Sequence, residues 1–450
     1  MNAKIEETSG MRSTITSRTV LGWALALALT TTVSYANNLV PGAKQDHPIL
    51  LKGGDIYTVS GSVLMQTDLL FENGKITRIE KDIVPAENTE VIDVAGKRVY
   101  PGLIAPNTTV GLIEIGAVRA TNDQSEVGNI TPEVCSHIAY NPDSELLPTI
   151  RSNGVTTVQV APANSLINGR SCIMNLDGWT KEDAAVKLLD GLYMSWPSVA
   201  VSTGWWVTQT PEEQKKNMAE ARVKLRQTFE NARAYALARK AMQNIGRDQR
   251  WEAMMPFISG ELPVYILADD YRQISEAIAF AEEQKIRMVL VSGAEAWKAI
   301  DLLKKHSIPV ILGTTTSLPM RTDDDYDQRF KLPKMLKEAG IQFCLGHSGS
   351  WDVRNLAFQG GQAAAFGLSK EDALRALTLS TAEILGIDKT QGSLDVGKNA
   401  TLFVSDGDVM DMLGQKVTNM YIEGRLVDLS NRHKELYEKY QAKHYSPVTK

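Results

Sequence analysis

Six histidines occur in the 450-residue chain, and their spacing predicts no local metal-binding motif. They are His47, His137, His306, His347, His433 and His444. No two of them form an HxH, HxxH or HxxxH pair. A hydrolytic metal site usually needs three or more nitrogen, oxygen or sulfur ligands that converge on one ion. Any such site would therefore have to be assembled from residues far apart in the sequence.

Other combinations of reactive side chains are also weak. Ser348 directly follows His347, and Asp269 and Asp270 form a neighbouring pair of carboxylates. Adjacent residues at a strand end point to opposite sides, so neither pair is well placed to share a proton. No G-x-S-x-G elbow is present. The three consecutive aspartates at 323–325 predict a solvated loop rim.

The three cysteines, Cys135, Cys172 and Cys344, are odd in number and widely spaced. They form no disulfide framework and no CxxC zinc spacing, so we expect small buried apolar residues. The chain is 43% hydrophobic and 22% charged, with a net charge of −5. This composition is typical of a soluble globular protein, and it gives no basic footprint for nucleic acid.

The first 36 residues have the order of a secretory signal. Arg12 and Arg18 precede an apolar run over residues 20–29, and Ser34 and Ala36 supply the small residues before a cleavage site. The run is too short to span a bilayer comfortably, so we predict no stable membrane span, although an uncleaved anchor stays an alternative. Met11 is an alternative start. We predict cleavage near Ala36 and a periplasmic or extracellular mature protein.

Residues 48–100 read as short strands. Apolar or alternating runs occupy residues 49–52, 56–59, 68–71, 75–79, 91–94 and 98–100. Asn73-Gly74 between two of them is a strong hairpin signal, because both residues tolerate a positive φ. This stretch predicts a small antiparallel sheet.

From residue 101 the sequence pattern predicts strands with helices between them. Buried-type strands are expected at 156–160, 264–267, 287–291, 309–312 and 341–345, with helices over 270–284 and 295–306. This alternation predicts parallel βα units, and their number favours an α/β fold with a (β/α)8 TIM-like barrel. Thr210 and Pro211 begin a capping box for a long charged helix that runs to about Met242 and packs on the barrel.

The C-terminal strands at 400–404 and 417–422 resemble the N-terminal ones, which predicts a barrel inserted in one discontinuous β-sandwich domain. The predicted organisation is a signal peptide (1–36), the first part of the sandwich (37–100), the barrel (101–390), the second part of the sandwich (391–430) and a helical tail (431–450).

Three segments carry a family resemblance. They are Arg98–Ile104 at the start of the first barrel strand, Ala376–Gly386 after the last strand, and Gly392–Ala400 at the turn into the sandwich. On these segments, in this order and at these separations, the chain resembles the amidohydrolase superfamily, close to its imidazolonepropionase-like members. The resemblance covers nearly the whole mature chain.

The resemblance implies hydrolysis of C–N bonds with one or two divalent ions such as zinc, which activate a water molecule. The ligands usually come from an HxH on strand 1, a histidine on each of strands 5 and 6, and an aspartate on strand 8. Some members add a bridging lysine, for which Lys187 is a weak candidate. The corresponding positions in this chain are Asn107 and Thr109, Asp269, Ser292, and Ser348 (or His347 if the register shifts by one), and the aspartate before the strand-1 pair falls on Ala105.

Neutral Asn and Thr oxygens do not replace imidazole on zinc. We therefore predict no metal cofactor and a polar pocket at the former ligand positions, with Trp205, Trp206 and Trp351 as rim aromatics. The catalytic residues are not identified.

Two functions remain open. The first is an exported, non-catalytic pseudoenzyme that binds a small molecule, or that forms a homo-oligomer or a hetero-oligomer with an active amidohydrolase paralogue. The second is an active hydrolase of C–N bonds with an atypical ligand set.

Overall fold

The computed structural model describes residues 39–241 and 245–445. The predicted signal peptide and its cleavage site near Ala36 lie outside the described residues, as does the predicted helix end at Met242. No helix in the described ranges is long and apolar enough to cross a membrane.

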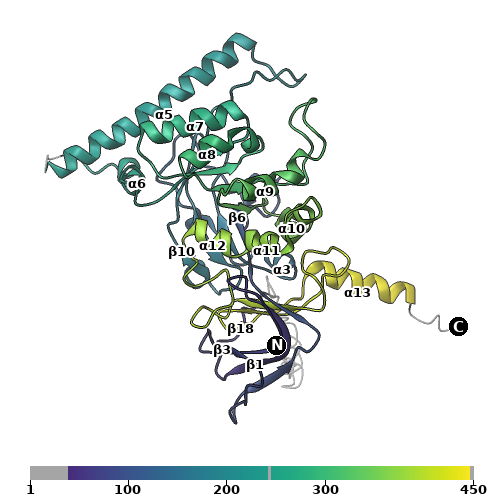
Figure 1. The fold of residues 1–450 in the computed structure, drawn as a ribbon. Helices are drawn as coiled ribbons and strands as arrows, with labels where there is room; N and C mark the ends of the chain where they lie inside the picture. The colour runs from purple at the N-terminus through teal and green to yellow at the C-terminus, as the bar shows by residue number, and fades with distance from the viewer. Residues whose placement is uncertain (1–38, 242–244, 446–450) are drawn as a thin grey trace, which may run out of the picture. The chain divides into compact units, whose positions relative to one another are not determined.

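Strands from both ends of the chain form one sheet of eight strands (Figure 1). Its order is β18-β17-β16-β5-β1-β2-β3, and β4 also pairs with β1. The strands are β1 (Ile49–Tyr57), β2 (Val63–Glu72), β3 (Lys75–Glu80), β4 (Glu90–Asp93), β5 (Arg98–Pro101), β16 (Leu402–Ser405), β17 (Val417–Ile422) and β18 (Arg425–Leu426). The residue boundaries of the domains stay predictions.

The expectation of a purely antiparallel N-terminal sheet is wrong. β4 and β5 both run parallel to β1, with Ile49 opposite Glu90 and Ile56 opposite Val99. Residues 90–101 form two short strands, β4 and β5, with a turn between them. Both strands pair with β1 and run in the same direction as β1. The predicted hairpin is confirmed, because β2 and β3 are antiparallel and Asn73 and Gly74 have φ angles of 52° and 74°.

The remaining strands follow the order of the predicted barrel. The parallel strands are β6 (Leu103–Thr108), β7 (Val155–Val160), β11 (Leu192–Ser195), β12 (Val264–Ala268), β13 (Met288–Ser292), β14 (Val310–Leu312) and β15 (Phe343–Leu345). β6 pairs with β7, and β11 to β15 pair in sequence. After β6 and β15 the chain segments meet, since the Thr109 amide donates to the Gly349 carbonyl at 3.0 Å. The predicted α/β fold class is confirmed.

One member of this strand order runs in the opposite direction. β8 (Ile167–Arg170) is antiparallel to β11, and β9 (Cys172–Asn175) is antiparallel to β7. Ser171 joins β8 to β9. The segment 167–175 therefore lies between β7 and β11 and runs antiparallel to both. The short β10 (Ala185–Lys187) pairs with β9 on the other side. A helical crossover is therefore missing between β7 and this segment.

The helices surround the parallel strands. The longer ones are α5 (Pro211–Lys240), α6 (Gln249–Ile258), α7 (Tyr271–Glu283), α8 (Ile300–Lys305), α9 (Gln328–Glu338), α10 (Leu356–Ala365), α11 (Lys370–Leu377), α12 (Leu379–Leu385) and α13 (Arg432–Tyr445). The short ones are η1 (Arg119–Thr121), α2 (Ser136–Ala139), α3 (Leu147–Arg151), α4 (Lys181–Ala184), η2 (Ala296–Ala299) and η3 (Asp352–Asn355). The helix expected over 295–306 is thus a 3-10 turn followed by a short α-helix.

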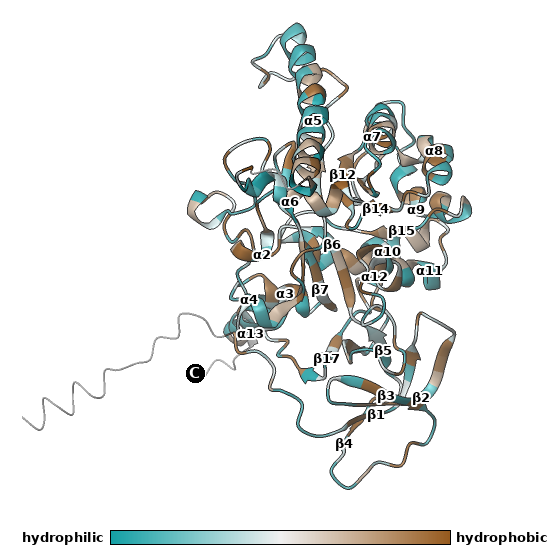
Figure 2. Cartoon of the chain, turned by 90° about the vertical axis from the view of Figure 1, so that its left-hand side faces the viewer, coloured by the Kyte–Doolittle hydropathy of each residue, from teal (hydrophilic) through white to brown (hydrophobic). Residues whose placement is uncertain are grey.

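The predicted capping box of α5 is confirmed, since Thr210 and Glu213 each bond to the other's main-chain amide. The helix buries Leu225 and Phe229, and Phe229 contacts Phe280 of α7 edge to face. Figure 2 shows hydrophilic residues over much of the rest of α5 and hydrophobic ones on β6 and β7. α5 therefore packs on the barrel through a narrow apolar face.

The space enclosed by the parallel strands is filled. Tyr193 of β11 stacks on Tyr265 of β12 with ring centres 4.8 Å apart, and both rings are buried. Ile384 and Leu385 of α12 join the same cluster. A filled interior of this kind leaves room for ligands only at the strand ends.

Candidate functional site

A pocket of about 560 Å³ lies at the C-terminal ends of the parallel strands. Its walls come from the segments that follow β6, β7 and β15, together with Tyr193 and Leu267. Barrel enzymes place their reactive groups at this end. We call it the mouth pocket and treat it as the candidate site.

Three of the six predicted site residues line the mouth pocket: Asn107, Thr109 and Ser348. Asn107 adopts a left-handed backbone with φ 55°, and its amide donates to the Gln159 side chain at 3.0 Å. The Thr109 side chain is 8% exposed and its hydroxyl oxygen has no hydrogen-bond partner. Ser348 is exposed. The wall at these three residues therefore presents neutral hydroxyl and amide groups.

The other three predicted residues, Asp269, Ser292 and His347, do not line this pocket. The Asp269 carboxylate accepts a hydrogen bond from the Ala294 amide at 3.1 Å, which links the segment after β12 to the turn after β13. The buried His347 ring places Nδ1 3.2 Å from the main-chain carbonyl of Ser348. A carbonyl can only accept, so Nδ1 is the donor in this contact and Nε2 is the ring nitrogen left to act as a base.

Ser292 has a left-handed backbone with φ 76°, which is strained for a residue with a Cβ atom. We predict that Ser292→Gly stabilises the protein by about 0.5–1 kcal/mol, because glycine adopts this φ without a steric cost. Chemical unfolding midpoints measure the change. Ser292→Ala is the control, because it keeps Cβ and should give no gain. Equal midpoints for wild type and Ser292→Gly would show that the backbone is unstrained here.

The donor set does not fit a divalent ion of the kind that the resemblance implies. Among residues 39–241 and 245–445, no group of three His, Cys, Asp or Glu side chains is arranged to hold a metal. Asp269 and His347 are already engaged with main-chain groups, and Asn107 and Thr109 offer only neutral oxygens. Imidazole, thiolate and carboxylate are the ligands that such ions need.

Lys187 does not line the mouth pocket. Its ammonium pairs with Asp190 at 2.9 Å and donates to the Leu385 carbonyl at the end of α12. Trp205 and Trp206 form an exposed edge-to-face pair, whereas Trp351 lines the mouth pocket. Of the three aromatics, Trp351 is therefore the one that the structure places at the site.

A buried polar network lies beneath the pocket, and sequence reasoning did not find it. Gln159 of β7 accepts a hydrogen bond from the Tyr193 hydroxyl at 2.6 Å and donates to Asp190 at 2.6 Å. Ser171 also donates to Asp190, whose side chain is fully buried. Burial raises the pKa of Tyr193 well above its usual range, and the Asp190 charge adds to the rise. A glutamine inside an apolar strand was the available signal for this network.

Charged residues form a second cluster on the rim beside β12 and β13. The buried Glu295 carboxylate accepts from Arg321 at 2.6 Å, from Lys298 at 2.8 Å and from the Tyr271 amide at 2.7 Å. Burial opposes ionisation of Glu295, but these hydrogen bonds outweigh it and lower its pKa to about 2. Arg321 also binds Asp270, the N-cap of α7. Arg321 therefore ties the loop at 313–327 to the loops after β12 and β13.

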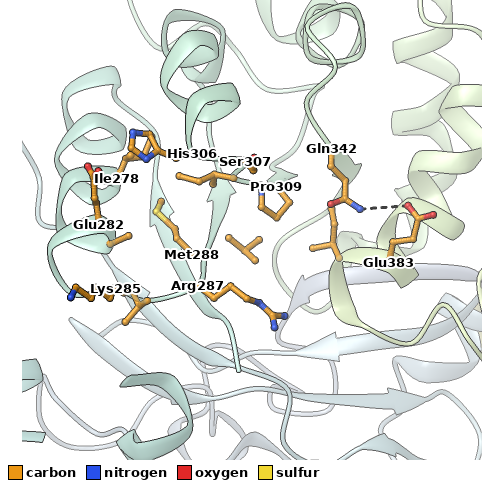
Figure 3. Close-up of a pocket in the computed structure, with 15 residues that line it drawn as sticks. Ile278, Glu282, Lys285, Arg287, Met288, His306, Ser307, Pro309, Gln342 and Glu383 are labelled. Carbon is orange, nitrogen blue, oxygen red and sulfur yellow. Dashed lines mark hydrogen bonds between the residues drawn. The ribbon is translucent and has the colours of Figure 1, made fainter. Parts of the chain in front are cut away.

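A second pocket, of about 450 Å³, lies at the opposite ends of the strands. Figure 3 shows Arg287 and Met288 at the start of β13, Pro309 before β14, and Gln342 facing Glu383 of α12. Barrel enzymes keep their reactive groups away from this end. We do not assign the candidate site to it.

Comparison with known proteins identifies the family of part of the chain. Residues 279–427 match the model of the amidohydrolase family. An amidohydrolase named tasK from Hapsidospora irregularis is 19% identical over 79% of this chain and 39% of its own length. A dihydroorotase from Syntrophus aciditrophicus (strain SB) is 30% identical over 32% of this chain and 35% of its own length. The chain thus spans less than two fifths of these relatives.

A solved structure shows the same fold over most of the chain. It is an amidohydrolase from Thermotoga maritima MSB8, with a TM-score of 0.74 and 24% identity. The similarity covers 84% of this chain and 99% of that one. The protein therefore contains an amidohydrolase-family domain and has the fold of the amidohydrolase superfamily. The imidazolonepropionase-like subtype stays a prediction.

Proposed function

We propose that the protein binds a small organic molecule in the mouth pocket and does not hydrolyse it. One observation carries this proposal: of the 16 lining residues, Glu114 is the single one with a formal charge at neutral pH. Hydrolysis of an amide needs an activated water and a positive group or a set of donors for the developing oxyanion. The lining contains no Lys, Arg or His for that purpose. Its apolar walls suit binding.

A second candidate function is hydrolysis of C–N bonds with an atypical ligand set. The family match over residues 279–427 and the relatives named amidohydrolase and dihydroorotase favour it. This function would need Asp269 or His347 to leave its main-chain partner and turn into the pocket.

Metal content separates the two candidates. We expect protein purified from metal-replete medium to contain no stoichiometric zinc, manganese or iron by elemental analysis, because the donors present do not suit these ions. Near-stoichiometric metal that Asp269→Ala abolishes would contradict the proposal. Asp301→Ala, at an exposed position of α8, is the matched control and should leave the metal content unchanged.

Two further parts of the proposal concern where the protein acts and with what. The charged, apolar and small-residue order of residues 1–36 supports export to the periplasm or the extracellular space. The residue types at Asn107, Thr109 and Ser292, where the resemblance implies metal ligands, support a role as a partner subunit beside an active amidohydrolase paralogue.

A further inference from the structure

The mouth pocket contains one isolated negative charge. Glu114 lies in the segment after β6 and is partly buried. One of its carboxylate oxygens accepts a hydrogen bond from the Asn141 amide group at 3.3 Å. In the described part of the chain no Lys, Arg or His forms an ion pair with Glu114. A partly desolvated carboxylate without a counter-ion attracts a cation from solution.

An unsatisfied hydroxyl supplies a second, independent observation. Thr109 lines the same pocket, is more than nine-tenths buried, and its oxygen lacks any hydrogen-bond partner in the described residues. A buried polar atom is rarely left without a partner. The oxygen is closed to solvent as it stands, so it would meet an N–H group of a bound ligand after rotation of the Thr109 side chain.

The rest of the wall is apolar. Ile113, Leu146, Pro162, Leu267 and Trp351 line the pocket. The Trp351 ring contacts the Arg354 guanidinium, 4.5 Å from its centre, and the His433 ring, whose centre is 5.2 Å away. An aromatic wall suits the apolar body of a ligand.

We infer that the mouth pocket selects organic ammonium compounds, in which a primary amine is joined to an aromatic or aliphatic body. The Glu114 carboxylate pairs with the ammonium group of the ligand, and Thr109 accepts a hydrogen bond from one of its N–H groups. The apolar wall contacts the aromatic or aliphatic part of the ligand. Ligands that end in a carboxylate are disfavoured, because no basic side chain lines the pocket. This inference rests on the proposed binding function and names its ligand class.

Three probes of similar shape test the charge preference: phenethylamine, 2-phenylethanol and 3-phenylpropionate. Isothermal titration of each is expected to show the amine binding about tenfold more tightly than the alcohol, and the carboxylate more weakly than either. Glu114→Gln keeps the size of the side chain and should remove most of the amine's advantage without changing the affinity for the alcohol. Glu126→Gln, exposed on the same segment and outside the pocket lining, is the control.

Thr109→Val removes the hydroxyl at nearly constant volume, and it should weaken the amine a few-fold more than the alcohol. The inference is overturned if the carboxylate binds as tightly as the amine, or if Glu114→Gln leaves the amine affinity unchanged. If none of the three probes binds, the proposed binding function fails with it. If the alcohol and the carboxylate bind and the amine does not, the ligand class alone is wrong.

Discussion

Replacing Asp190 with alanine is expected to destabilise the protein by about 3–5 kcal/mol. The Asp190 side chain is fully buried and accepts hydrogen bonds from Gln159, Ser171 and Lys187. Alanine leaves the buried Gln159 amide group without an acceptor and leaves the Ser171 hydroxyl only the Gly191 carbonyl at 3.3 Å. It also leaves the Lys187 ammonium without its counter-charge. Water reaches Lys187, which is 29% exposed, but it does not reach Gln159. Urea unfolding followed by tryptophan fluorescence measures the loss.

Two controls separate this effect from a general cost of mutation. Asp190→Asn keeps the shape and one acceptor oxygen, so its loss should be intermediate. Asp301→Ala removes an exposed carboxylate and should change stability by less than about 0.5 kcal/mol. An unchanged midpoint for Asp190→Ala would show that the network does not contribute to the fold.

Asp190→Ala should also weaken ligand binding in the mouth pocket. Gln159 holds both the Asn107 amide and the Tyr193 hydroxyl, and both of these residues line the pocket. Without Asp190, the Gln159 side chain loses the partner that fixes its orientation. Probe affinity should therefore fall in Asp190→Ala even at temperatures where the protein remains folded.

The second large effect is expected from Glu295→Gln, which we predict to destabilise the protein by about 1–3 kcal/mol at neutral pH. Glu295 is buried, and its carboxylate neutralises Arg321 and Lys298. Glutamine keeps an acceptor for the Tyr271 amide but removes the charge. Solvent around the partly exposed Arg321 screens part of the interaction, which holds the loss below that of a fully sealed ion pair.

The pH dependence gives this prediction a clear sign. The folded-state pKa of Glu295 is lowered to about 2 from an ordinary value of 4.5. Its stabilising contribution is therefore complete above the ordinary value and is lost as the pH falls toward 2. The stability gap between wild type and Glu295→Gln should shrink over that window. A gap that is constant from neutral pH to the lowest pH at which the protein folds would contradict the assigned ion pairs. Asp324→Asn, which loses only a 3.9 Å pair with Lys298, should show a smaller gap.

The local patterns predicted most of the parallel strands, because a buried parallel strand needs a short run of apolar and β-branched residues. The run at 156–160 became β7, and the runs near 264, 288 and 310 became β12, β13 and β14. The antiparallel segment of β8 and β9 was missed. It is interrupted at Ser171 and contains Gly169, so neither periodicity nor composition indicates a strand there.

The candidate site was less predictable from the sequence. Alignment with a family assigns positions along the chain, but it does not assign the direction of each side chain. Ser292 has a left-handed backbone, the Asp269 carboxylate binds the Ala294 amide, and neither residue lines the pocket. The side-chain hydrogen-bond partners of Gln159 lie between 31 and 52 residues away, and Ser171 lies 19 residues from Asp190. Only the folded barrel brings these residues together.

The pairing of β5 with β16 sets the order in which the molecule can be completed. Pro101 lies opposite Leu402, and the whole barrel sequence separates them. Contacts between such distant residues form slowly, because a long chain must close before they are made. During synthesis β5 is finished long before β16 exists, so its edge stays open to wrong partners. This sheet can therefore be completed only after the C-terminal strands have been synthesised.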